Sequence, residues 1–216
     1  MYFVHGLYGM EVEKILQEVD AFLADHEGEI IILDFQHFYS FTKENHSYLM
    51  TIINSYFGSR MCPTSHTLTH VTLRWMKEKG YQVIVIYRND AAAGVPVYWP
   101  SNSWPTPWPE TTVISTMIAF LEEKITFRPI DTGFVTQCVL TPDVKFFLKH
   151  CFSSLEEKCG KPCNKAIIPW LQKQQPGSKG VNIVISDFIQ MDNIPFCKTV
   201  IQLNASLLQE VKKSSQ

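Results

Sequence analysis

Short, nearly continuous apolar runs are the feature that most limits what this chain can fold into. EIIILDF (residues 29–35) and YQVIVIY (residues 81–87) are the clearest examples. A strand with both faces covered shows this pattern, whereas a strand with one face in water alternates apolar and polar residues. Residues 11–25, by contrast, place their apolar side chains at helical spacing. Strands that alternate with helices are typical of a parallel α/β architecture.

The same alternation continues along the chain. The predicted strands are residues 2–5, 29–35, 81–87, 133–142 and 181–188, and the predicted helices are residues 11–25, 43–56, 67–79, 113–125, 143–157 and about 196–211. No glycine-rich nucleotide-binding motif follows any of these strands. This alternating pattern does not distinguish a doubly wound sheet from a barrel. A complete eight-stranded barrel usually needs about 250 residues, so a chain of 216 residues with five clear strands resembles a barrel without its front.

Residues 95–109, VPVYWPSNSWPTPWP, form a segment rich in proline and tryptophan that we call the tryptophan arm. Its prolines exclude a regular helix or a central strand, so we expect a surface loop or an arm around a sheet edge. Its tryptophans could enter a lipid interface, where tryptophan is favoured. The alternative, which we favour, is that they pack the arm onto the domain.

The composition fits one globular domain and assigns no partner by charge. The chain is 45% hydrophobic, and 19 basic against 21 acidic residues give a formal net charge of -2. The net charge of the chain therefore provides no attraction to nucleic acid or to an anionic membrane. No segment approaches the roughly 18 uncharged apolar residues of a membrane span, and the first residues lack a signal-peptide pattern. We expect a cytoplasmic or nuclear protein without a transmembrane segment, whose contact with membranes is peripheral.

Six cysteines are scattered at irregular spacing. A chain of this length does not need disulfide bonds, so reduced thiols are expected. Cys159 and Cys163 form a C-x3-C pair, but no second pair follows at a ligand spacing. A zinc site is therefore not expected.

Polar side chains follow several predicted strands at the ends where parallel α/β proteins carry their reactive groups. These residues are His5, Asp34, Gln36, Arg88 and Asp187. Because side chains alternate along a strand, Asp34 and Gln36 share a face. A histidine and carboxylates around one edge can perform general acid–base chemistry. An arginine there can hold a phosphate through two hydrogen bonds.

Each of these residues also has a structural interpretation. A histidine at a strand end is more often a hydrogen-bonded packing residue than a catalyst, and Asp34 and Asp187 can cap the helix or turn that follows. His37 lies on the opposite face from Asp34 and precedes two aromatic residues, which favours packing. The residues alone therefore indicate an α/β domain that could handle phosphate, and nothing more specific.

Several strings of the sequence resemble one protein family. They are YFVHGLYG, ILDFQHFY, the MCP at residues 61–63, WMKEKGYQVIVIY, PWPETT, CVLTP and QPGSKGVNIVISDF. In this order, from residue 2 to about residue 207, they resemble the X-domain-containing proteins of the phosphatidylinositol-specific phospholipase C superfamily. The chain is most similar to the small, atypical vertebrate members that consist of an X-type domain alone. The resemblance implies one partial catalytic domain over residues 1–216, with an irregular (β/α) barrel of the triosephosphate isomerase type that lacks its first strands.

The resemblance also implies a reaction. In the family, the inositol 2-hydroxyl attacks the phosphorus of a glycerophosphoinositol, diacylglycerol leaves, and a cyclic inositol phosphate is hydrolysed afterwards. One histidine acts as general base on the hydroxyl, and a second protonates the departing glycerol oxygen. The implied partner is phosphatidylinositol or another inositol phospholipid at a membrane surface, and no nucleic acid.

Site roles follow from the same resemblance. The H-G of YFVHGLYG matches the second histidine of the family, so His5 would be the general acid. Asp187 is similar to the strand-end carboxylate that orients the first histidine. Arg88 resembles a substrate-contacting basic residue of bacterial members, and Asp34 or Gln36 stands where relatives place a polar group near the inositol. The acidic and amide ligands of the calcium-dependent mammalian enzymes have no convincing copy here, so calcium is not expected.

The chain departs from the family at its start. Relatives carry an upstream strand with a glycine-serine-histidine-aspartate motif that supplies the general base, and then a strand with an arginine-rich tyrosine-leucine-aspartate motif. Neither motif occurs in these residues. We therefore expect impaired catalysis by this chain, and a non-catalytic phosphoinositide-binding or regulatory module is the alternative function.

Overall fold

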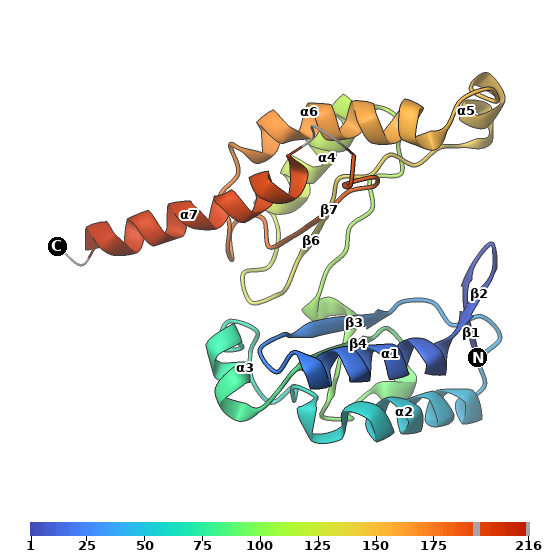
Figure 1. Cartoon of the computed structure of the whole chain (residues 1–216), viewed down its shortest axis with the longest axis vertical. Helices are drawn as coiled ribbons and strands as arrows, with labels where there is room; N and C mark the ends of the chain where they lie inside the picture. The colour runs from blue at the N-terminus through green and yellow to red at the C-terminus, as the bar shows by residue number, and fades with distance from the viewer. Residues whose placement is uncertain (192–194, 215–216) are drawn as a thin grey trace. The chain divides into compact units, whose positions relative to one another are not determined.

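The computed structural model describes residues 1–191 and 195–214, with side chains as far as residue 205. The chain forms two compact units, Met1–Ser103 (unit 1) and Trp104–Gln216 (unit 2). Strands and helices alternate in both units (Figure 1). The mixed α/β class predicted from the apolar runs is confirmed.

Unit 1 is built on a three-stranded parallel sheet in the order β3-β4-β5. The strands are β3 (Ile31–Phe35), β4 (Val83–Tyr87) and β5 (Tyr98–Trp99). β3 and β4 are the two apolar runs from which the parallel sheet was predicted. All residues of β4, the central strand, are buried, whereas those of β3 are half-buried.

The two faces of this sheet have different roles. The odd-numbered residues of β3 and β4 belong to the hydrophobic cluster of unit 1. Asp34 and Ile86 are register partners, and because side chains alternate along a strand they lie on the other face. Arg88 follows Ile86 by two residues. The polar strand-end residues are thereby separated from the hydrophobic cluster.

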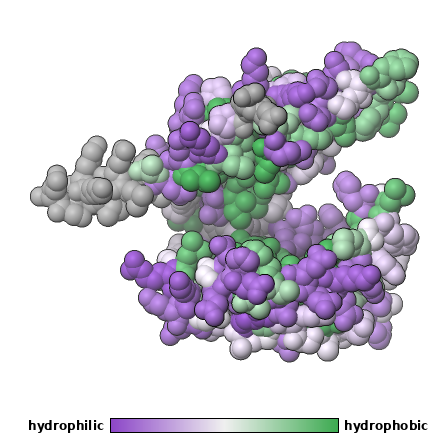
Figure 2. Space-filling model, viewed as in Figure 1, coloured by the Kyte–Doolittle hydropathy of each residue, from purple (hydrophilic) through white to green (hydrophobic). Residues whose placement is uncertain are grey.

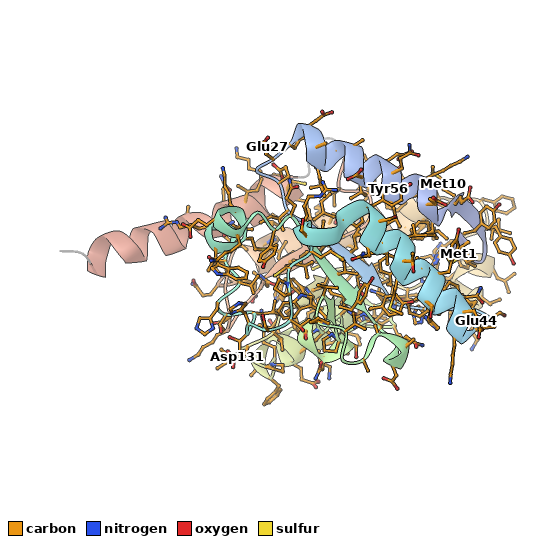
Figure 3. All side chains as sticks on the ribbon, turned by 90° about the horizontal axis from the view of Figure 1, so that it is seen from below. Met1, Met10, Glu27, Glu44, Tyr56 and Asp131 are labelled. Carbon is orange, nitrogen blue, oxygen red and sulfur yellow. The ribbon has the colours of Figure 1, made fainter. Side chains whose placement is uncertain are left out.

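Helices α1 (Val12–Asp25) and α2 (Lys43–Phe57) cover the odd-numbered face. Figure 3 shows them side by side and running in the same direction, α1 from near Met10 towards Glu27 and α2 from Glu44 to Tyr56. Both helices match their predicted ranges closely. Their most deeply buried side chains are Leu16, Leu23, Ile53 and Phe57.

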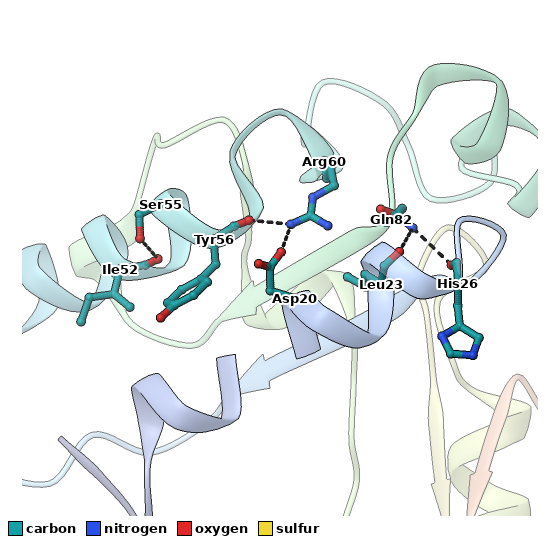
Figure 4. Close-up of polar contacts among 8 residues, drawn as sticks. All are labelled: Asp20, Leu23, His26, Ile52, Ser55, Tyr56, Arg60 and Gln82. Carbon is teal, nitrogen blue, oxygen red and sulfur yellow. Dashed lines mark hydrogen bonds and ion pairs between the residues drawn. The ribbon is translucent and has the colours of Figure 1, made fainter. Parts of the chain in front are cut away.

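Polar contacts tie α1 to the segments around it (Figure 4). Arg60, which ends a short 3-10 helix (Gly58–Arg60) after α2, forms an ion pair with Asp20 of α1. Gln82, just before β4, donates its side-chain amide to the carbonyl oxygen of Leu23 at 3.2 Å. The amino end of β4 is therefore attached to the last turn of α1.

The first residues form an antiparallel hairpin, which corrects the expectation of parallel strands throughout. β1 (Tyr2–His5) and β2 (Leu7–Glu11) pair with each other and not with the sheet of unit 1. The chain reverses at Gly6, whose φ of 74° lies in the left-handed region that glycine adopts readily. The predicted strand at residues 2–5 exists, but it is exposed.

The helix predicted for residues 67–79 is shorter than expected. α3 spans Leu73–Lys79, and the residues before it form turns. The side chain of Thr72 caps the helix, because its hydroxyl accepts the backbone N–H of Trp75 at 3.1 Å. The helix therefore starts where its free N–H groups first find a side-chain acceptor.

Unit 2 contains a two-stranded parallel sheet of β6 (Val135–Gln137) and β7 (Ile183–Ile185), both shorter than the predicted strands. Three helices pack around it: α4 (Ile114–Thr126), α6 (Lys161–Leu171) and α7 (Phe196–Ser214). The hydrophobic cluster of this unit includes Met117, Leu121, Ile167 and Leu171. α4 and α7 confirm the predicted helices near residues 113–125 and 196–211.

The helix predicted for residues 143–157 is divided. α5 covers only Val144–Lys149, and a single π-helical turn, Glu156–Gly160, leads into α6. Asp143 caps α5, because its carboxylate accepts the backbone N–H of Phe146 at 2.7 Å. α6, which the sequence analysis did not assign, contains an internal proline, Pro169.

Most of the tryptophan arm packs onto the protein, which is the alternative that we favoured over insertion of its tryptophans into a lipid interface. Trp99 and Trp104 are buried, and Trp108 is 42% exposed. The arm also supplies β5, a two-residue edge strand, which is the position in a sheet where neighbouring prolines are tolerated. Further short 3-10 turns lie at Asp90–Ala92 and Ser101–Ser103.

Among the described residues the strands form three separate sheets, and no closed barrel is present. No helix in the described part of the chain is both long and apolar enough to cross a bilayer. All six cysteines are free thiols in this structure.

Candidate active site

A cavity of about 370 Å³ lies at the carboxyl end of β3. Its walls come from the β1–β2 hairpin, from the segment that follows β3 and from α1 and α2. Three of the predicted site residues, His5, Asp34 and Gln36, line it. Small-molecule sites usually measure ~300–1,000 Å³. Parallel α/β proteins bind ligands beyond the carboxyl ends of their strands, so both size and position fit a ligand site.

Asp34 is the centre of the polar network in this site. Its carboxylate accepts two hydrogen bonds from Arg88, from Nε at 2.7 Å and from Nη2 at 2.9 Å. It accepts a third from the side-chain amide of Gln36 at 2.9 Å. The side chains of Arg88 and Asp34 are only 15% and 20% exposed. This bidentate, partly desolvated pair fixes the planes of both groups.

The Arg88 guanidinium is shared between several oxygen atoms. Besides the Asp34 carboxylate, the carbonyl oxygen of Ser101 accepts from its Nη1 at 3.4 Å. Its positive charge is balanced by Asp34, and Arg88 itself is not among the residues that line the cavity. The pairing follows from the register, because Asp34 lies opposite Ile86 and Arg88 follows on the same face.

His5 ends β1 and lines the cavity with an exposed side chain. Its position is set by the hairpin, in which His5 pairs with Leu7 across the turn at Gly6. Within the described residues, no hydrogen bond holds the His5 imidazole. The ring is therefore accessible to exchange a proton with a bound ligand.

His37 lines the same cavity, which the sequence analysis missed. We predicted packing, but the side chain is exposed, and its ring lies 6.4 Å from that of Tyr39. The prediction used strand alternation, and β3 ends at Phe35. Gln36, the next residue, still lies beside Asp34, as their hydrogen bond shows, but His37 no longer follows the alternation. Two imidazoles consequently face one cavity.

A buried histidine lies behind the wall of the cavity. His46 of α2 forms a hydrogen bond with Tyr87 of β4, with Nδ1 2.7 Å from the hydroxyl oxygen. The rings of Phe38 and Phe41 lie 4.8 and 5.1 Å from the imidazole. Burial lowers the pKa of His46 and raises the pKa of the Tyr87 hydroxyl. Both groups are therefore neutral near pH 7 and join the helix to the sheet.

Asp187 belongs to unit 2, where it follows β7 at its carboxyl end with an exposed side chain. The buried amide of Asn164 donates to its backbone oxygen at 2.8 Å, and Ser186 donates its hydroxyl to the same amide at 2.5 Å. Burial, and then the Asp187 charge, raise the pKa of Cys163 to about 12. The end of β7 is thus firmly attached to α6.

The described ranges, 1–191 and 195–214, contain no group of three or more His, Cys, Asp or Glu side chains that could hold a metal ion. The site contains two histidines, a carboxylate–guanidinium pair and an amide, all near the carboxyl edge of the parallel strands. The cavity therefore combines a few polar side chains with a lining that is mostly apolar and aromatic, as is common for small-molecule sites.

Comparison with known proteins assigns the family. PI-PLC X domain-containing protein 3 from Mus musculus is 38% identical over 205 residues, which cover 94% of this chain and 63% of that protein. PI-PLC X domain-containing protein 2 from Mus musculus is 40% identical over 205 residues, 94% of this chain and 59% of that protein. PI-PLC X domain-containing protein 1 from Homo sapiens is 33% identical over 219 residues, with 96% and 63% covered.

The chain belongs to the family of PI-PLC X domain-containing proteins, as the sequence motifs indicated. It spans about 63% of the length of the relatives named PI-PLC X domain-containing protein 3. No protein-family model matches the chain. No solved structure matches it either.

Proposed function

We propose that this chain is a phosphoric diester hydrolase of the phosphatidylinositol phospholipase C type, which cleaves phosphatidylinositol to diacylglycerol and inositol phosphate. The observation that carries the proposal is the cavity of unit 1. His5, from a motif specific to the family, lines it together with Asp34 and Gln36. A proton-transfer group and hydrogen-bonding groups for an inositol ring therefore meet in one pocket of suitable size.

In the proposed reaction, the inositol 2-hydroxyl attacks phosphorus and the bond to the glycerol oxygen breaks. His5 in its protonated form gives its proton to that oxygen as diacylglycerol leaves. Asp187 is proposed to correspond to the strand-end carboxylate that, in relatives, orients the histidine which removes the proton of the 2-hydroxyl. The motif that carries this histidine does not occur in the 216 residues. Loss of one member of an acid–base pair typically costs about 10²- to 10⁴-fold in rate, so we expect slow turnover.

The Asp34–Arg88 pair and Gln36 are proposed to bind the inositol ring. Asp34 can accept hydrogen bonds from ring hydroxyls and Gln36 can donate to them, while Arg88 holds the Asp34 carboxylate in place. Because the guanidinium charge is already balanced by Asp34, the network suits neutral hydroxyl groups better than a free phosphate. This differs from the simple phosphate clamp that an arginine after a strand first indicates.

The parallel strands also bear on the architecture that we propose for the whole domain. Five strands pair in parallel, β3 to β5 in one sheet and β6 with β7 in another, and parallel pairing of neighbouring strands is one feature of a (β/α) barrel. We propose an irregular barrel in which residues 1–216 are part of a single X-type catalytic domain. The protein is proposed to act in the cytoplasm or nucleus, at a membrane surface and without calcium.

Release of inositol phosphates from phosphatidylinositol vesicles tests the proposal. The chain is compared with His5→Ala and with His66→Ala, a matched variant whose exposed histidine lies outside the cavity. We expect slow release that His5→Ala lowers by about 10²-fold or more, that His66→Ala leaves unchanged, and that a calcium chelator does not affect. Vesicle binding without release by any protein would instead favour the non-catalytic phosphoinositide-binding module.

A further inference from the structure

The segment of residues 144–155, which contains α5 and the turn after it, exposes several large apolar side chains. We call it the α5 segment. Figure 2 shows hydrophobic residues gathered at the α5 end of unit 2, beside hydrophilic ones. The exposed apolar residues, with their exposed fractions, are Val144 (74%), Phe147 (52%), Leu148 (74%), Phe152 (102%) and Leu155 (41%). Single exposed apolar residues are ordinary, but a cluster of this kind marks an interaction site.

The spacing of these residues shows that the exposure is built into the segment. Val144, Phe147 and Leu148 follow the i, i+3, i+4 spacing of one helical stripe on α5, and Phe152 and Leu155 extend this exposed apolar surface beyond the end of the helix. In most surface helices such a stripe faces the core. Here Phe146, on the other side of α5, packs against the hydrophobic cluster of unit 2. The stripe therefore points away from its own unit.

Charge favours one type of partner for this stripe. Lys145 and Lys149 are exposed within the segment, and no Asp or Glu occurs between residues 144 and 155. The flanking acidic residues are already engaged. Asp143 caps α5, and Glu156 and Glu157 pair with Lys161. An apolar stripe with lysines beside it matches an anionic lipid surface, where the rings enter the headgroup region and the ammonium groups contact phosphates.

The position of the segment in unit 2 agrees with such a role. The α5 segment follows β6, and Asp187 follows β7, and the two strands are parallel. The carboxyl ends of both strands therefore lie at one edge of the sheet, where α/β proteins bind their ligands. A membrane docked on the α5 segment would approach unit 2 from the edge that carries Asp187.

We propose that the α5 segment is the surface through which this protein docks on a bilayer that contains anionic phospholipid. The inference rests on the proposed function, because a hydrolase of a membrane lipid has to reach its substrate in the bilayer. It also assigns docking to a specific surface. The tryptophan arm contributes less, because two of its three tryptophans are buried.

Co-sedimentation with vesicles tests the docking surface. The full chain is mixed with vesicles of phosphatidylcholine alone or with about one fifth phosphatidylserine, at low and high salt. The test variants are the triple change Phe147→Ser, Leu148→Ser, Phe152→Ser and the double change Lys145→Glu, Lys149→Glu. The matched control is Phe127→Ser with Ile130→Ser, which alters exposed apolar residues of the same unit outside the segment.

We expect the wild type and the control to bind the anionic vesicles, with binding weakened by salt. Both test variants should lower the partition coefficient by about tenfold or more. Equal binding by all proteins, loss of binding in the control alone, or no binding by the wild type would overturn the proposal. A wild-type dimer that the triple variant converts to monomer would assign the stripe to a second copy, and would also overturn it.

A soluble substrate separates this inference from the proposed function. Hydrolysis of a short-chain phosphatidylinositol below its micellar concentration does not need membrane docking. The triple variant should hydrolyse it as the wild type does. If no protein hydrolyses it but vesicle binding still depends on the α5 segment, the docking surface stands and the catalytic proposal fails.

Discussion

At the residue scale, the Asp34–Arg88 pair explains how polar groups are held at the edge of an apolar sheet. Each group alone would be poorly solvated, because the side chains are only 20% and 15% exposed. Together with Gln36 they satisfy one another through three hydrogen bonds. Breaking a desolvated pair is costly because the remaining charge loses its partner.

Replacement of Asp34 by Asn tests this explanation. The variant keeps the shape of the side chain but leaves Arg88 without its carboxylate. We expect the free energy of unfolding to fall by roughly 1–3 kcal/mol, measured by urea denaturation. Glu18→Gln, at an exposed position on α1, serves as the control and should change little. Equal midpoints for the two variants would argue against a structural role for the pair.

The buried His46 predicts a pH dependence of stability. Its pKa is lowered from 6.5 by burial, so the unfolded chain takes up a proton at a higher pH than the folded chain does. The stability associated with neutral His46 is present above pH 6.5 and is lost as the pH falls below it. His46→Gln can still bond to the Tyr87 hydroxyl but does not titrate. Lowering the pH from about 7.5 to about 5.5 should therefore reduce the melting temperature of the wild type more than that of this variant. Parallel losses in the two proteins would exclude His46 as a source of the pH dependence.

At the element scale, the strands that could be predicted were those with continuous apolar residues. β3, β4 and β7 fall within the predicted apolar runs, although only β4 is buried along its whole length. β5 was missed because two residues between prolines carry no periodicity. The hairpin was missed because its pairing depends on a reversal at Gly6, and the apolar residues of β1 resemble a core strand although they are exposed.

The candidate site could be predicted in part for the same physical reasons. Strand alternation placed Asp34 and Gln36 on one face, and their hydrogen bond confirms it. The pairing of Asp34 with Arg88 depends on the register of β3 against β4, which no local pattern encodes. His37 lies beyond the end of the strand and no longer follows the alternation.

The tryptophan arm contacts unit 2 through Trp104, whose ring lies against Gly133, and a substitution can test this contact. A Cβ added at Gly133 would lie 2.2 Å from the ring of Trp104, so only glycine leaves room for the ring there. We expect Gly133→Ala to lower the free energy of unfolding by roughly 1–3 kcal/mol through overpacking. Gly28→Ala is the control, because its nearest neighbour is 3.9 Å away. Identical melting temperatures would mean that the ring can move aside without cost.

At the scale of the whole molecule, two compact units each place polar residues at the carboxyl edge of a parallel sheet. Unit 1 brings together His5, Asp34, Gln36 and Arg88, and unit 2 carries Asp187. The family was recognisable from the sequence because its motifs coincide with these strand ends. The central claim that follows is that the cavity of unit 1 is the site for the inositol headgroup.

Titration of the histidine ring protons with myo-inositol 1-phosphate, followed by NMR, tests this claim most directly. His5 and His37 line the cavity, whereas His66 and His150 do not, so the chain contains its own reference signals. We predict saturable shifts of the His5 and His37 resonances, with those of His66 and His150 unchanged. Shifts at His66 or His150 instead, or none at any histidine, would contradict the assignment of the headgroup to this cavity.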